Sequence, residues 1–104
     1  MANPRIEPLK KVLAIDPTDD VAWFGLGKAY MDDANFEEAA AALEGCLKVK
    51  PTYSAAYYAL AQSLHKLGRN EECRRICDQG IEVSTKNGDA MVTKNLALLK
   101  QTLG

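Results

Sequence analysis

This chain has few of the features that mark an enzyme or a membrane protein. Its 104 residues include a single histidine, and no Ser-His-Asp order, phosphate-binding loop or paired-carboxylate motif is evident. That leaves little general acid–base chemistry at neutral pH. Its apolar runs, such as Ala39 to Leu43, are far short of the length that spans a bilayer. We therefore expect no enzyme activity and no membrane partner.

Cysteine and excess charge are also scarce. Three cysteines without paired spacing do not make the disulfide framework of a secreted protein, so we expect a reducing, cytoplasmic compartment. The formal net charge of −1 provides no basic footprint for nucleic acid. What is present is an ordinary globular composition, 47% hydrophobic and 26% charged, in a chain long enough for one domain.

The chain contains an internal repeat with a period of 34 residues. A fixed period of this length is typical of helical repeat arrays, in which each unit buries its apolar face only against a neighbour. Function is then expected on a surface and not in a catalytic pocket. The pairs that match at this offset include Leu13 and Leu47, Pro17 and Pro51, Trp23 and Tyr57, Phe24 and Tyr58, Leu26 and Leu60, and Glu37-Glu38 and Glu71-Glu72.

Apolar residues recur at intervals of three and four, which is the spacing of helices. We expect two full helical hairpins, preceded by one helix that has no hairpin partner and followed by one closing helix. The expected helices are Glu7–Ile15, Asp20–Met31, Asn35 to the residue before Pro51, Thr52 or Ser54 to about Leu67, Glu71 to near Thr85, and Asp89 onwards.

Cap and turn residues separate these helices. Asn35, followed three positions later by Glu38, predicts a capping box in which each side chain binds a free backbone N–H. Thr52 or Ser54 is expected to cap the next helix in the same way. Gly68 follows that helix and predicts its C-terminal end.

Two motifs, one in each copy of the repeat, resemble the tetratricopeptide repeat (TPR) at its usual spacing. The first copy reads Trp23-x-x-Leu26-Gly27-x-x-Tyr30, then Ala39-x-x-x-Leu43, then Pro51. The second is looser and reads Tyr57-x-x-Leu60-Ala61-x-x-Leu64, then Cys73 and Cys77, with no proline at Thr85. Gly27 and Ala61 are small at positions where two helices must approach closely.

The resemblance implies an all-α fold, a right-handed α-solenoid of helical hairpins forming a single TPR domain. Its expected division is a partial preceding repeat helix over 1–19, repeats over 20–53 and 54–87, and a C-terminal capping helix over 88–104. No cofactor is implied.

Adjacent aromatics in each repeat predict a binding surface. Neighbours on a helix point about 100° apart, so if Trp23 and Tyr57 pack inside the repeats, Phe24 and Tyr58 lie on a second stripe. In the family that this chain resembles, that stripe lines a concave groove that holds a peptide or a partner helix. The alternative is that Phe24 and Tyr58 pack against neighbouring repeats or the end helices. The expected groove residues are Phe24, Lys28, Met31, Tyr58, Gln62 and His65.

Some members of the family hold acidic C-terminal peptides in a clamp of cationic and amide side chains. In this chain the clamp positions carry Phe24, Lys28, Ala59, Asp89 and Thr93, and only Lys28 is a cation. Recognition of such peptides by that mechanism is therefore not expected.

The spacing Cys73-x-x-x-Cys77, with His65 nearby in sequence, is also compatible with a metal or redox site. These cysteines occupy apolar core positions of their helix, as Cys46 does in the first repeat. Free cysteine packs as a small hydrophobe, so buried packing is favoured and no metal is expected.

Two functions are consistent with these features. The first is a non-enzymatic scaffold that binds a peptide or a helix of a partner protein in the concave groove. The alternative is an assembly module that self-associates or docks on the rest of a longer chain, because the first expected helix lacks a hairpin partner. A homo-oligomer is therefore possible. That helix carries Leu9, Val12, Leu13 and Ile15, whereas the closing helix offers the polar residues Lys94, Asn95, Lys100 and Gln101.

Overall fold

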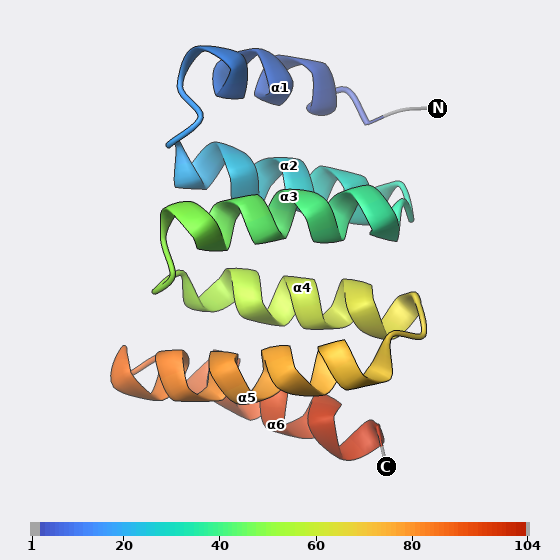
Figure 1. Cartoon of the computed structure of the whole chain (residues 1–104), viewed down its shortest axis with the longest axis vertical. Coiled ribbons are helices and arrows are strands. Elements are labelled where there is room, and N and C mark those ends of the chain that lie inside the picture. Colours follow the sequence, from blue (N-terminus) through green and yellow to red (C-terminus); the bar gives the residue numbers. More distant parts are fainter. Residues whose placement is uncertain (1–2, 104) are drawn as a thin grey trace.

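A computed structural model describes residues 3–103, and within that range every regular element is an α-helix. Successive helices run in opposite directions and stack along the long axis of the molecule (Figure 1). This is an all-α helical-repeat solenoid of about two repeats with flanking helices, as expected. The helices are α1 (Ile6–Ile15), α2 (Asp20–Asp32), α3 (Phe36–Val49), α4 (Ser54–Lys66), α5 (Asn70–Lys86) and α6 (Ala90–Thr102).

The capping box at the start of α3 is only half formed. The Asn35 side-chain oxygen accepts a hydrogen bond from the Glu38 N–H at 3.4 Å, as predicted. The Asn35 N–H, which a complete capping box would pair with the Glu38 carboxylate, donates instead to the Tyr30 carbonyl oxygen at 2.9 Å. In the tight α2–α3 turn a backbone carbonyl oxygen therefore accepts the hydrogen bond that the Glu38 carboxylate would accept in a complete capping box.

The predicted cap of α4 is wrong. The residue that precedes the helix is Tyr53, which makes no side-chain cap bond. The Asn87 amide instead donates to the Thr52 carbonyl oxygen and to the Ser54 hydroxyl oxygen, both at 2.8 Å, and so ties the start of α4 to the α5–α6 turn. The end of α4 is as predicted, because Gly68 has a φ of 75°, a backbone conformation that glycine adopts readily.

The 34-residue register is lost between α5 and α6. Pro51 follows the end of α3, but its counterpart Thr85 can donate a backbone hydrogen bond, and α5 continues to Lys86. The helix α6 then begins at Ala90 with a shifted face. Leu96 is fully buried against Gly80 of α5, although its counterpart in the second repeat, Gln62, is partly exposed.

Small residues allow the helices of each hairpin to approach closely, as predicted. A Cβ added to Gly27 of α2 would lie 2.6 Å from Cγ of Leu43 in α3. In the second hairpin the Cys73 thiol of α5 donates to the Ala61 carbonyl oxygen of α4 at 3.2 Å. The large aromatic of each repeat lies inside its hairpin. The Trp23 ring covers Gly45 of α3, and Tyr57 is buried beside Gly80 of α5.

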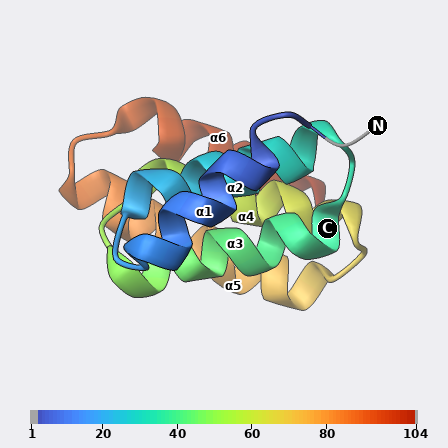
Figure 2. The same cartoon turned by 90° about the horizontal axis from the view of Figure 1, so that it is seen from above.

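The helices form two layers. The helix α4 packs against both α2 and α6, whereas no Cα atom of α3 lies within 8 Å of a Cα atom of α5. Figure 2 shows α3 and α5 along one side of the molecule, and α6 on the opposite side. The surface of α2 and α4 that faces away from α3 and α5 is therefore a continuous strip. In residues 3–103 no helix is long and apolar enough to cross a membrane.

Candidate functional site

The residues predicted to form the groove come together on the two neighbouring helices α2 and α4. We call them the inner stripe. None of the six is buried: His65 is exposed and the other five are half-buried. The stripe combines three large apolar side chains with three polar ones, a composition that suits a protein-binding surface. Its members are Phe24, Lys28 and Met31 from α2 and Tyr58, Gln62 and His65 from α4.

One end of the inner stripe is held by a stack of side chains from α2 and from the loop between α3 and α4. The Phe24 ring stacks on the Tyr53 ring, with centroids 5.0 Å apart and planes 26° from parallel. The Lys50 ammonium lies 5.7 Å from the centroid of the Tyr53 ring and 3.9 Å from a carboxylate oxygen of Asp20. Phe24 thus packs against the next repeat, as the alternative prediction held, and still keeps part of its surface exposed.

The apolar members of the stripe are seated on the core. Phe24, Met31 and Tyr58 all pack against the buried cluster formed by α3, α4, α5 and α6. Their rings and chains are therefore positioned before a ligand arrives, which reduces the entropy lost on binding.

Sequence reasoning missed Tyr53 and Lys50 as parts of this surface. Tyr53 stands where the first repeat has Asp19, whose carboxylate caps α2 through the Ala22 N–H at 3.0 Å. The sequence signal for Tyr53 was an aromatic residue at the position where the first repeat has a helix-capping aspartate. Burial raises the pKa of the Tyr53 hydroxyl, which is consistent with a ring inserted between the repeats.

Two of the residues at the clamp positions taken from the family pattern do not contribute to the inner stripe. Ala59 is buried, and the Thr93 hydroxyl is hydrogen-bonded to the Ser84 hydroxyl at 2.6 Å. Lys28 remains in the inner stripe as its cation.

The three cysteines are core residues. Cys46, Cys73 and Cys77 are fully buried, whereas His65 is exposed. Desolvation raises the pKa of the Cys46 thiol to about 11 and that of Cys77 to about 12, so both are protonated at neutral pH. Within residues 3–103 no three or more potential metal ligands gather in one place. The buried packing expected from the sequence is confirmed.

The comparison with protein families agrees with this architecture. The family model for the tetratricopeptide repeat matches residues 6–45 and 31–92. The chain belongs to the tetratricopeptide repeat family. TPR domains mediate protein–protein interactions, so the fold is that of an interaction scaffold.

Relatives of similar length share the fold along most of the chain. The TPR repeat-containing protein PA0015 of Pseudomonas aeruginosa is 32% identical over 98 residues, which cover 94% of this chain and 93% of the relative. The solution structure of protein BPP2914 from Bordetella parapertussis is 30% identical, with a TM-score of 0.80, and the match covers 94% of this chain and 85% of that one. A TPR domain protein of Salinibacter ruber is 26% identical with a TM-score of 0.75, over 85% and 89% of the two chains.

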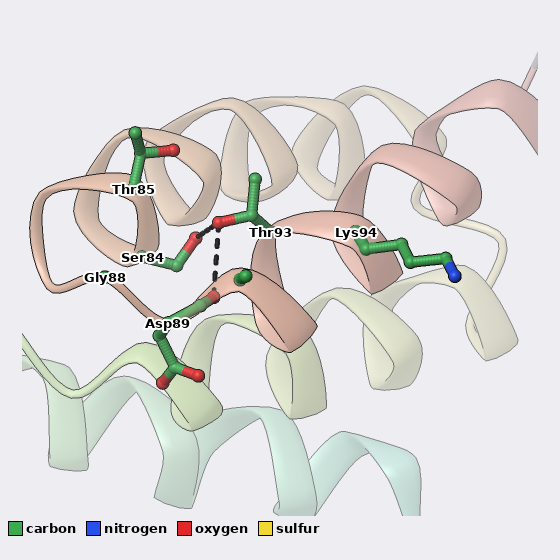
Figure 3. A pocket seen from close by; sticks show the side chains of 7 residues that line it. Ser84, Thr85, Gly88, Asp89, Thr93 and Lys94 are labelled. Carbon is green, nitrogen blue, oxygen red and sulfur yellow. Dashed lines mark hydrogen bonds between the residues drawn. The ribbon is translucent and has the colours of Figure 1, made fainter.

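A separate pocket of about 330 Å³ lies at the α5–α6 turn of the TPR domain (Figure 3). Two of its hydroxyls, those of Ser84 and Thr93, are hydrogen-bonded to each other, and Thr93 also donates to the Asp89 carbonyl oxygen at 3.3 Å. The Asp89 carboxylate and the Lys94 ammonium point away from this pair. The pocket therefore presents no pair of groups arranged for catalysis.

Proposed function

We propose that this TPR domain is a scaffold that binds a peptide segment or a helix of a partner protein along the inner stripe. The observation that supports the proposal is the placement of three large, half-buried apolar side chains on two adjacent helices, beside three polar side chains. Aromatic residues of this kind contribute a large share of the binding energy in many interfaces, because they bury much surface at low entropic cost.

The two kinds of side chain have different roles in this proposal. Phe24, Met31 and Tyr58 are the apolar anchors, since they are already packed against the core and expose a remaining face. Lys28, Gln62 and His65 supply hydrogen-bond donors and acceptors between and beyond the anchors. These polar groups select the register of the ligand, because each unmatched polar group on the ligand costs free energy when it is desolvated.

The test begins with capture of partner proteins from a native lysate by the wild-type chain, followed by affinity measurement with the captured protein. We expect the double variant Phe24→Ala, Tyr58→Ala to bind at least about tenfold more weakly, which corresponds to about 1.4 kcal/mol. Because Phe24 stacks on Tyr53, the melting temperature of the double variant is measured in parallel.

Charge reversal provides a second variant that leaves the core packing intact. Lys28→Glu changes the inner stripe, whereas Lys48→Glu changes an exposed lysine of α3 on the opposite layer. We expect only Lys28→Glu to alter the affinity. If the captured protein binds the double variant and both lysine variants as it binds the wild type, and all of them remain folded, the proposal is wrong.

A further inference from the structure

The turn between α5 and α6 contains the pair Asn87-Gly88, and no other asparagine of the chain precedes a glycine. In such a pair the backbone nitrogen of the glycine can attack the side-chain amide carbon of the asparagine, because glycine has no Cβ to obstruct the approach. Both residues are exposed, and Gly88 lines the open pocket at this turn (Figure 3). The turn therefore brings together, within reach of water, the groups that take part in a deamidation.

The Asn87 side chain also joins two parts of the molecule that are far apart in sequence. Its amide nitrogen donates to the Thr52 carbonyl oxygen and to the Ser54 hydroxyl oxygen, both at 2.8 Å. Thr52 lies just before α4, and Ser54 is the first residue of that helix and is buried. We call these two hydrogen bonds the Asn87 contact. It uses both N–H groups of the side-chain amide.

The folded turn opposes the reaction. Asn87 has φ −78° and ψ −8°, so the Gly88 nitrogen does not lie on the same side of the Cα–C bond as the Asn87 Cβ, and the peptide must rotate before a ring can close. That rotation breaks the backbone bonds from Gly88 N–H to the Thr85 carbonyl oxygen at 3.1 Å and from Asp89 N–H to the Ser84 carbonyl oxygen at 2.8 Å. The Asn87 contact holds the amide on α4 in addition. Deamidation therefore requires a local opening of the turn.

We propose that Asn87 is a site of spontaneous deamidation, which the Asn87 contact slows and which destroys that contact once it has occurred. The Gly88 nitrogen loses its proton and attacks Cγ of Asn87. The Cγ–Nδ2 bond breaks and ammonia leaves, so that a succinimide ring forms. Water then opens the ring, giving aspartate if the new Cγ–N bond breaks and isoaspartate if the original peptide bond breaks. One water molecule is consumed and one ammonia is released.

Neither product can restore the Asn87 contact. A carboxylate has no N–H, so it offers the Thr52 carbonyl oxygen no donor, and only the Ser54 hydroxyl can still pair with it. In isoaspartate the main chain passes through the former side-chain carbon, which lengthens the turn by one atom and disturbs the bond from Asp89 to Ser84. The reaction is not reversed by closing the turn. A turn that has opened and reacted is therefore held less firmly on α4 from then on.

The rate of the reaction tests the protective role of the contact. The purified chain is incubated in mildly alkaline buffer, and mass spectrometry of its peptides follows the exchange of –NH₂ for –OH. We expect modification at Asn87, faster in denaturing urea than in buffer, and much less at exposed Asn70, which precedes a glutamate. Ser54→Ala should make the reaction about two- to tenfold faster in buffer, because one hydrogen bond of the closed turn is lost. Thr52→Ala is the matched control and should leave the rate unchanged, since its carbonyl oxygen remains.

The effect of the product is measured on Asn87→Asp, which has the sequence of the aspartate form. We expect its melting temperature to fall by at least about 4 °C, because the bond to Thr52 is lost. Gln101→Glu is the control for charge: it also changes an exposed amide to a carboxylate near the C-terminal end of a helix. Its melting temperature should change by less than half as much. Circular dichroism shows whether each variant is folded before heating.

Four results would overturn the proposal. The first is modification of Asn70 to the same extent as Asn87. The second is an equal rate at Asn87 in buffer and in urea, which would mean that the fold gives no protection. The third is an equal rate in Ser54→Ala and Thr52→Ala. The fourth is a melting temperature of Asn87→Asp equal to that of the wild type.

Discussion

Two glycines in one helix provide a sensitive test of the packing inside the first hairpin. Gly25 and Gly27 both lie in α2. A Cβ on Gly25 would lie 3.4 Å from the end of the Leu9 side chain, an ordinary contact, whereas a Cβ on Gly27 would lie 2.6 Å from both Cγ and Cδ2 of Leu43. We therefore expect Gly25→Ala to stabilise the protein and Gly27→Ala to be less stable than Gly25→Ala.

The magnitude follows from two opposing effects. Alanine is favoured over glycine in a helix interior by roughly 0.8–1 kcal/mol, and both variants gain this amount. Gly25→Ala should therefore stabilise by up to about 1 kcal/mol. Overpacking a well-filled core costs about 1–3 kcal/mol, and only Gly27→Ala incurs it, because Leu43 is fully buried and has little room to move. The difference between the two variants isolates the clash at roughly 1–3 kcal/mol.

The assay is urea and thermal unfolding followed by far-ultraviolet circular dichroism. For a domain of this size, 1 kcal/mol shifts the melting temperature by roughly 4–8 °C. Repeating Gly27→Ala in a Leu43→Ala background should remove its penalty, because the clashing atoms are gone. Should Gly27→Ala prove at least as stable as Gly25→Ala, the close approach of α2 and α3 would be refuted.

Two further predictions concern stability. Burial raises the pKa of the Cys46 and Cys77 thiols to about 11 and about 12, above the ordinary value of 9.0. The folded state therefore holds these protons more tightly than the unfolded state does. The stabilisation that this gives is complete below pH 9 and is lost as the pH rises from 9 towards 11–12. Replacing both residues with alanine should make the melting temperature depend less on pH in that window, and an unchanged dependence would contradict this. Asn87→Ala removes the 2.8 Å bonds to Thr52 and Ser54 and should cost about 1–2 kcal/mol, whereas an unchanged urea midpoint would show that the turn is not held by Asn87.

The repeat made much of the fold predictable. The two 34-residue units carry the same pattern of small and large residues, so the close approaches at Gly27 and Ala61 could be located before the structure was known. The buried state of Cys73 and Cys77 followed in the same way, because both occupy positions that are apolar in the first copy. The close packing and burial of these residues depend only on their positions within a hairpin.

Features that depend on contacts between repeats could not be read from the pattern. Tyr53 lies between Thr52 and Ser54, the two expected caps of α4, but its ring stacks on Phe24 of α2. The absence of proline at Thr85 was visible, yet the resulting extension of α5 and the burial of Leu96 depend on how α6 packs.

The central claim is that the inner stripe holds the partner, and photo-crosslinking tests it most directly. A photoreactive phenylalanine analogue replaces Tyr58 on α4 in one variant and Lys48 on α3 in another, and each is illuminated in native lysate. We predict that the protein captured by the wild type crosslinks from position 58 and not from position 48. Crosslinking of the same protein from position 48, with none from position 58, would contradict the claim.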